Sequence, residues 1–171
     1  MWQQRALMPS ANPHEPSPAL FLHGLDSSIR GTKAQWFRLH FPEVRMRDYE
    51  GDLAQRLAQL EDQVTGLDRL VLVGSSFGGL MAACFAIRHP ERCRRLVLLA
   101  PALNFNGYQA PPIPLTVPTV LVMGEHDTVC PPDLVLPQAR ATFSNLEVRI
   151  EDDDHMLHRT FPVLDWQALL T

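Results

Sequence analysis

Residues 70–79 have the sequence LVLVGSSFGG, and this segment decides the fold. The four consecutive apolar residues 70–73 are typical of a strand that is buried on both faces of a parallel sheet. The following residues, 77–89, are rich in alanine and end before Pro90, which predicts a helix. A turn of the form G-x-S-x-G joins the strand to the helix and has Ser76 at its centre.

The rest of the chain repeats this alternation of short apolar runs and amphipathic segments. We expect further strands at 19–22, 43–49, 95–100, 119–123 and 146–150, and further helices at 32–40, 52–66, 132–143 and, interrupted by Pro162, 156–170. The pattern predicts an α/β fold, a three-layer sandwich in which helices cover both faces of a mostly parallel sheet of about six strands. Residues 1–18 contain four prolines and are expected to form a loosely ordered lead-in, and 19–171 a single domain.

The composition excludes several classes of function. The chain of 171 residues has 15 Lys and Arg against 19 Asp and Glu, so it lacks the positive surplus that binds nucleic-acid phosphates. No apolar run approaches the roughly 20 residues that cross a bilayer, and 1–18 lacks the continuous apolar stretch of a secretory signal. Three cysteines give no even disulfide framework, which indicates a reducing compartment, and we expect a cytoplasmic protein.

The G-x-S-x-G turn is typical of a nucleophilic serine. The turn is so sharp that residues two positions either side of the serine must be glycine, and Gly74 and Gly78 meet this requirement. The alternative is a purely structural role, a glycine-rich turn in which Ser76 only caps the helix. A serine nucleophile needs a base, and the base needs an acid that orients it.

Two later strands end in residues that can serve as this acid and base. Asp127 follows the strand 119–123 and His155 follows the strand 146–150, so both are expected at the same sheet edge as Ser76. The chain order Ser, Asp, His is also the order found with G-x-S-x-G turns. Glu125 is the alternative acid and His158 the alternative base.

Two backbone N–H groups are expected to stabilise the negative oxygen that forms during acyl transfer. One belongs to Phe77, directly after the serine, and the other to Leu25, in the loop that His23 anchors. We expect no cofactor and no metal, since Asp154, His155 and His158 lack a third strong ligand at a recognised spacing. The run 152–154 of three aspartates is expected to be a solvated loop.

These residues together resemble the α/β-hydrolase superfamily from residue 19 onward. Within it, FLHGLDSS at 21–28 and GTKA at 31–34 are similar to small esterases and acyl-protein thioesterases. The resemblance implies a serine hydrolase whose nucleophile, acid and base are Ser76, Asp127 and His155. Two departures from the family pattern are expected: the first two strands of larger members are missing, and the Pro-rich loop after residue 100 replaces the helical lid.

Without a lid, the substrate pocket should be shallow and open. Its expected walls are Leu25, Phe77, Leu103, Phe105, Tyr108 and Met156. Such a pocket favours a small ester with a short acyl chain as the substrate. Two alternatives remain open: a thioesterase that removes acyl groups from proteins or carriers, and a non-catalytic binding module that kept the fold.

Overall fold

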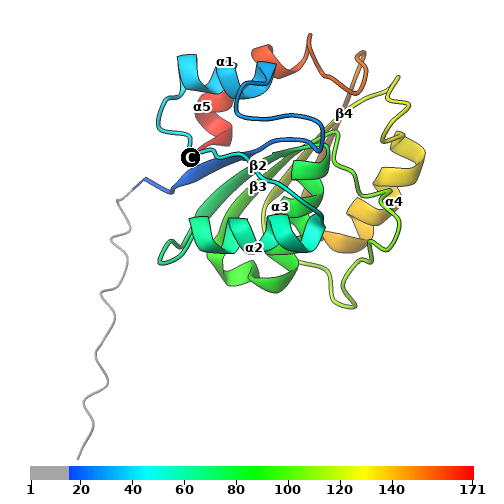
Figure 1. Ribbon diagram of the computed structural model, residues 1–171. Coiled ribbons are helices and arrows are strands. Elements are labelled where there is room, and N and C mark those ends of the chain that lie inside the picture. The colour runs from blue at the N-terminus through cyan, green and yellow to red at the C-terminus, as the bar shows by residue number, and fades with distance from the viewer. Residues whose placement is uncertain (1–15) are drawn as a thin grey trace, which may run out of the picture.

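One parallel sheet organises the chain, as the computed structural model in Figure 1 shows for residues 16–171. The five strands of this described part lie side by side in chain order: β1 (Ala19–Leu22), β2 (Leu70–Ser75), β3 (Cys93–Leu99), β4 (Thr119–Gly124) and β5 (Leu146–Glu151). Each lies close to a predicted strand. Most of the predicted lead-in, residues 1–15, lies outside the described residues.

The sixth predicted strand, 43–49, pairs at one point only. Arg45 forms a parallel bridge with Leu20, in which its N–H donates to the Ala19 carbonyl and its own carbonyl accepts from the Phe21 N–H, both at 2.9 Å. Val44 and Tyr49 are buried. The apolar alternation therefore reflects an extended segment packed against the edge strand β1, and the ladder does not continue.

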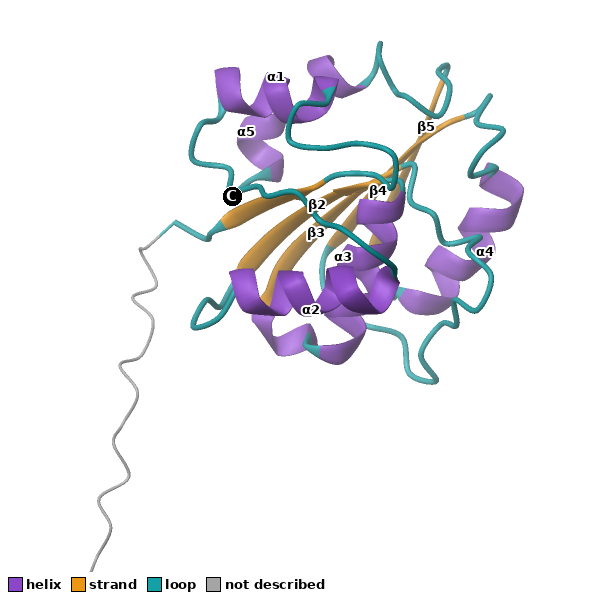
Figure 2. Cartoon of the chain, in the orientation of Figure 1, coloured by secondary structure: helices purple, strands orange, loops and turns teal. Residues whose placement is uncertain are grey.

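Helices cover both faces of the sheet (Figure 2). On one side lie α1 (Thr32–His40) and α5 (Trp166–Leu169), and on the other α2 (Leu53–Gln63), α3 (Phe77–Arg88) and α4 (Pro132–Thr142). Strand β2 shows why both faces need cover, because Leu70 and Leu72 pack toward α2 and α3 while Val71 and Val73 pack toward α1. The predicted three-layer α/β sandwich is confirmed.

Two further segments of the chain contain no long helix. Residues 101–118 join β3 to β4 without helix or strand, so this part of the chain forms no lid. The predicted helix 156–170 is broken at Pro162, where a short 3₁₀ turn (Phe161–Val163) precedes α5. In the described residues, no helix has the length and apolar character needed to span a membrane.

Candidate active site

Ser76 lies at the carboxyl end of β2, on a strained turn into α3. Its backbone has φ 54° and ψ −115°, in the region that L-residues rarely adopt. A Cβ atom on Gly74 would lie 2.3 Å from the carbonyl oxygen of Gly78, and one on Gly78 would lie 2.0 Å from that of Leu22. Both positions therefore require glycine, and the Ser76 side chain is held at the end of the sheet.

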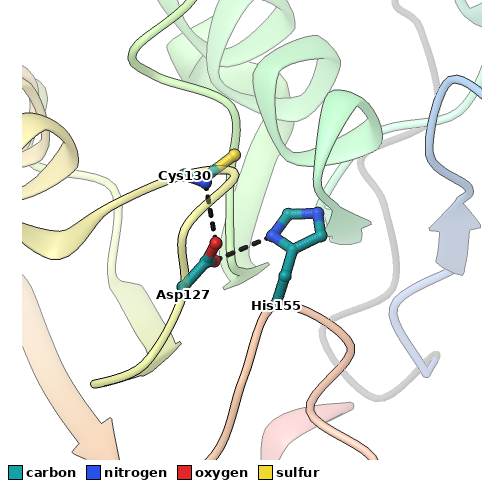
Figure 3. A group of neighbouring side chains, drawn as sticks. All are labelled: Asp127, Cys130 and His155. Atoms are coloured by element: carbon teal, nitrogen blue, oxygen red, sulfur yellow. Dashed lines mark hydrogen bonds and ion pairs between the residues drawn. The ribbon is translucent and has the colours of Figure 1, made fainter.

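Ser76, His155 and Asp127 form a continuous chain of hydrogen bonds, although they come from three separate strand ends. The Nε2 atom of His155 lies 3.0 Å from Ser76 Oγ, and its Nδ1 atom lies 2.8 Å from Asp127 Oδ2. Figure 3 shows the Asp127 carboxylate between the ring of His155 and the backbone of Cys130. In this arrangement the carboxylate accepts the Nδ1 proton and leaves the Nε2 lone pair facing Ser76.

The backbone fixes the Asp127 carboxylate. Its Oδ1 atom accepts hydrogen bonds from the N–H groups of Val129 at 2.8 Å and Cys130 at 2.7 Å, and the residue exposes only 4% of its surface. Glu125 and His158, the alternative acid and base, are exposed. Within the described residues, neither is hydrogen-bonded to Ser76 or His155.

The loop that carries His155 is held by a buried carboxylate, and the expectation that residues 152–154 are all solvated is wrong. Asp153 accepts four hydrogen bonds: from the N–H groups of Asp154, Arg159 and Thr160 and from the Thr160 hydroxyl. Burial by itself raises the pKa of Asp153, but these hydrogen bonds outweigh it and lower the pKa below its ordinary value. The sequence showed only an acidic run, which does not distinguish a loop-fixing carboxylate from a solvated one.

Cys130 lies beside these residues, in the same turn as Asp127. The thiol is buried, and burial, with the neighbouring charge of Asp127, raises its pKa to about 11, although the Ser76 hydroxyl offsets part of the increase. A thiol with this pKa is protonated at neutral pH, which makes Cys130 a poor candidate for a nucleophile.

The two residues that are predicted to supply oxyanion donors, Phe77 and Leu25, both lie next to the cavity that Ser76 lines. Phe77 is the first residue of α3, so its N–H has no partner within the helix. In the described part of the chain, the N–H groups of Phe77 and Leu25 donate no hydrogen bond. The loop before Leu25 lies against the serine, because a Cβ on Gly24 would be 3.5 Å from Ser76 Cβ. His23 anchors this loop, accepting at Nε2 from the Tyr49 N–H and contacting the Gly24 carbonyl through Nδ1.

A buried arginine that sequence reasoning missed lies behind this donor pair. Arg56 of α2 is 5% exposed, and its Nη2 atom donates to the Leu25 carbonyl at 3.2 Å while its guanidinium lies 5.4 Å from the centre of the Phe77 ring. Its Nη1 atom is buried without a hydrogen-bond partner. The available signal was an arginine on the apolar face of the helix, between Leu53 and Leu60.

A cavity of about 530 Å³ opens beside Ser76 and His155. Four of the predicted wall residues line it, namely Leu25, Phe77, Phe105 and Met156. Leu103 does not line the cavity, because it is buried in the core. Tyr108 lines a separate hollow of about 280 Å³, and its hydroxyl is hydrogen-bonded to that of Thr142.

Lys33 also lines the cavity, where its Nζ donates to the Met156 carbonyl at 2.5 Å, and burial lowers its pKa.

Comparisons with known proteins agree with this architecture. The sequence model described as the alpha/beta hydrolase fold matches residues 22–116, more than half of the chain. Among curated proteins, homoserine O-acetyltransferase of Thermus thermophilus is 40% identical over 60 residues, which cover 35% of this chain. Those residues make up only 14% of that protein's length.

Solved structures match over a much larger share of the chain. Alpha/beta hydrolase domain-containing protein 10 from mouse has a TM-score of 0.70 at 18% identity and covers 85% of each chain. Est1E from Butyrivibrio proteoclasticus has a TM-score of 0.72 at 16% identity, covering 95% of this chain and 89% of the other. At these identities the likeness shows the fold.

Proposed function

Because the chain belongs to the alpha/beta hydrolase fold family, we propose that it is a serine hydrolase that cleaves carboxylic esters with short acyl chains. The observation that carries this proposal is the hydrogen-bond chain from Ser76 Oγ through His155 to Asp127. A non-catalytic binding module has no need to hold these three side chains in line, nor to keep Ser76 in a strained backbone.

The geometry supports a two-step acyl transfer. In the first step His155 Nε2 accepts the proton of the Ser76 hydroxyl as Oγ bonds to the ester carbonyl carbon. The carbonyl electrons move to the oxygen, which the N–H groups of Phe77 and Leu25 stabilise. When the C–O bond breaks, His155 returns its proton to the alcohol. Water then repeats the sequence on the acyl-serine and releases the acid.

The cavity supports a small apolar acyl group as the part of the substrate that enters. A volume of about 530 Å³ lies within the usual range for small-molecule sites. Leu25, Phe105, Val129 and Met156 line it, and each leaves more than 40% of its surface exposed, so the mouth is wide and apolar. With no lid in residues 101–118, a long acyl chain would leave most of its length in water.

The proposal predicts that hydrolysis of nitrophenyl esters is fastest with acetyl and butyryl groups and falls with longer chains. The reason is that each added methylene beyond the cavity gains no further contact. The measurement is kcat/KM across the acyl series, with acetyl and butyryl thioesters of matched length in the same panel. A strong preference for dodecanoyl esters contradicts the short-chain proposal, and a preference for thioesters identifies a thioesterase.

The matched control is Ser76→Ala. It should lose labelling by a fluorophosphonate and at least about 10⁴-fold of the hydrolysis rate, since the covalent step is gone. Its thermal unfolding should remain cooperative. Labelling that persists in Ser76→Ala would place the nucleophile elsewhere.

A further inference from the structure

Three different metal-binding groups meet beside the proposed nucleophile. They are the Asp127 carboxylate, the Cys130 thiol and the His155 imidazole, and one ligand atom of each lies within 4.8 Å of the other two (Figure 3). Asp127 and Cys130 come from the turn after β4, and His155 comes from the loop after β5. The group shares only His155 with the set Asp154, His155 and His158, whose spacing argued against a metal site.

We propose that these three side chains bind a zinc-like divalent cation that reversibly inhibits the enzyme. Sulfur, imidazole nitrogen and carboxylate oxygen are the ligands that zinc uses in proteins, and three such ligands leave one coordination position for water or Ser76. The thiol favours soft or borderline ions over magnesium and calcium, which prefer oxygen ligands. The inhibition rests on the proposed function, whereas the binding can be measured without it.

The cation has a route to the three ligands. Cys130 and His155 both line the cavity of about 530 Å³ next to Ser76, and the Asp127 carboxylate lies behind them. Tetrahedral zinc with bonds of about 2.0–2.3 Å holds its ligand atoms roughly 3.3–3.8 Å apart. Since the three ligand atoms already lie within 4.8 Å of one another, they need to approach by only about 1 Å.

A cation that binds either ring nitrogen of His155 stops the proposed reaction. Binding at Nδ1 replaces the hydrogen bond to Asp127, and binding at Nε2 occupies the lone pair that faces Ser76. The Cys130 thiol proton leaves to solvent when the sulfur–metal bond forms, and no electron is transferred. A bound cation therefore removes the base while leaving the protein folded.

A second group on the surface provides the internal control. Glu125, His126 and Asp152 also place ligand atoms within 4.8 Å of one another, but all three residues are exposed and none supplies sulfur. The His126 imidazole already contacts both carboxylates, since its Nε2 atom lies 3.1 Å from an oxygen of each. We expect this group to bind zinc weakly at most.

The test is a calorimetric titration of the metal-free wild-type protein, Cys130→Ala and His126→Ala with zinc. The wild type and His126→Ala should bind one ion with equal affinity. Cys130→Ala should bind at least about 100-fold more weakly, because loss of a direct ligand exceeds the 10–100-fold effect of losing an outer partner. Cys130→Ser, which keeps the size of the side chain but removes the sulfur, should weaken binding in the same way.

Cadmium gives the second readout, because a cadmium–thiolate bond absorbs in the ultraviolet. This absorption should appear with the wild type and be absent from Cys130→Ala and Cys130→Ser. Zinc should also slow fluorophosphonate labelling of the wild type, EDTA should restore it, and magnesium should have no effect.

The outcomes separate this inference from the proposed function. A metal-free wild type that is never labelled contradicts the proposed function and leaves the binding measurement standing. Equal zinc affinity in the wild type and Cys130→Ala, or a loss of binding in His126→Ala alone, overturns the metal site. Zinc binding at Cys130 without any slowing of labelling overturns the inhibition.

Discussion

At the scale of single residues, the backbone supplies most of the hydrogen bonds that hold the two buried carboxylates of the candidate site, Asp127 and Asp153. Two N–H groups fix the Asp127 carboxylate, and three fix the carboxylate of Asp153 next to the loop of His155. The strained turn at Ser76 is fixed by Gly74 and Gly78. Such contacts depend on the local path of the chain, so the fold itself holds these groups in place.

Arg56 is the exception, because its side chain contacts both residues that are predicted to supply the oxyanion donors. Arg56→Met keeps an unbranched apolar stem but removes the charge and the hydrogen bonds to the carbonyls of Leu25 and Gly51. We expect kcat to fall by about tenfold, less than for a direct oxyanion donor, with a smaller change in KM. Steady-state kinetics on a short-chain ester measure both.

Thermal unfolding separates this positioning role from a structural one. Arg56 buries a charge with an unpaired Nη1 atom, so Arg56→Met should unfold at the same or a higher temperature than the wild type. Arg56→Lys keeps the charge but not the planar group, and it should recover part of kcat. A fall of Tm and activity together in Arg56→Met would show that the residue only supports α2.

At the scale of elements, α4 contains a proline in its interior. Pro137 lies in the middle of the helix, where it has no N–H to donate, and it is exposed. Pro137→Ala should raise the free energy of unfolding by about 2 kcal/mol, the helix gain less the entropy that proline removes from the unfolded chain. Chemical denaturation measures this gain, and thermal unfolding should show a rise of roughly 4–8 °C.

Pro132 is the matched control for this change. It is the first residue of α4, where its missing N–H would have no partner in the helix, so Pro132→Ala should bring no gain. Equal stabilisation by both substitutions would mean that the effect comes from some source other than the helix hydrogen bond.

The elements themselves were the most predictable part of the molecule. Strands buried on both faces, such as 70–73, are predictable from their continuous apolar runs. The start of α2 is predictable from Asp52, which forms a capping box with Gln55. Residues 43–49 show the limit: an apolar alternation indicates which side chains are buried, but not whether a neighbouring strand continues the pairing beyond Arg45.

At the scale of the whole molecule, Asp153 links stability to pH. Its lowered pKa means that the unfolded chain binds this proton more readily, so its contribution is present above the ordinary pKa of 3.8 and is lost as the pH falls further. Asp153→Asn replaces an acceptor by an amide donor and should reduce the free energy of unfolding at pH 7 by about 1–3 kcal/mol. Urea unfolding at neutral and acid pH measures the free energy of unfolding of both proteins. The difference between the wild type and Asp153→Asn should become smaller below about pH 4.

Asp152 is the matched control, since its carboxylate is exposed and contacts Arg159 and His126 at the surface. Asp152→Asn should leave the stability at pH 7 almost unchanged. If the free energies of unfolding of the wild type and Asp153→Asn differed by the same amount at neutral and acid pH, Asp153 would not link stability to pH.

The site was predictable where it depends on topology and not where it depends on loop paths. Ser76, Asp127 and His155 follow strands of one parallel sheet, so the order of the strands brings them to one edge. No comparable topological rule predicts the path of the loop 101–118. In the structure, Phe105 lines the cavity while Leu103 is buried in the core. Arg56 was missed for a related reason, because the target of its guanidinium lies on a distant loop.

The close approach of α3 to β1 has a consequence for directed evolution. At Gly78 any side chain would collide with the backbone of Leu22, so random substitution there yields mostly inactive sequences. The exposed cavity residues Leu25, Phe105, Val129 and Met156 carry no such restriction. A combinatorial library confined to these four positions should therefore retain a high fraction of folded members while sampling new substrate preferences.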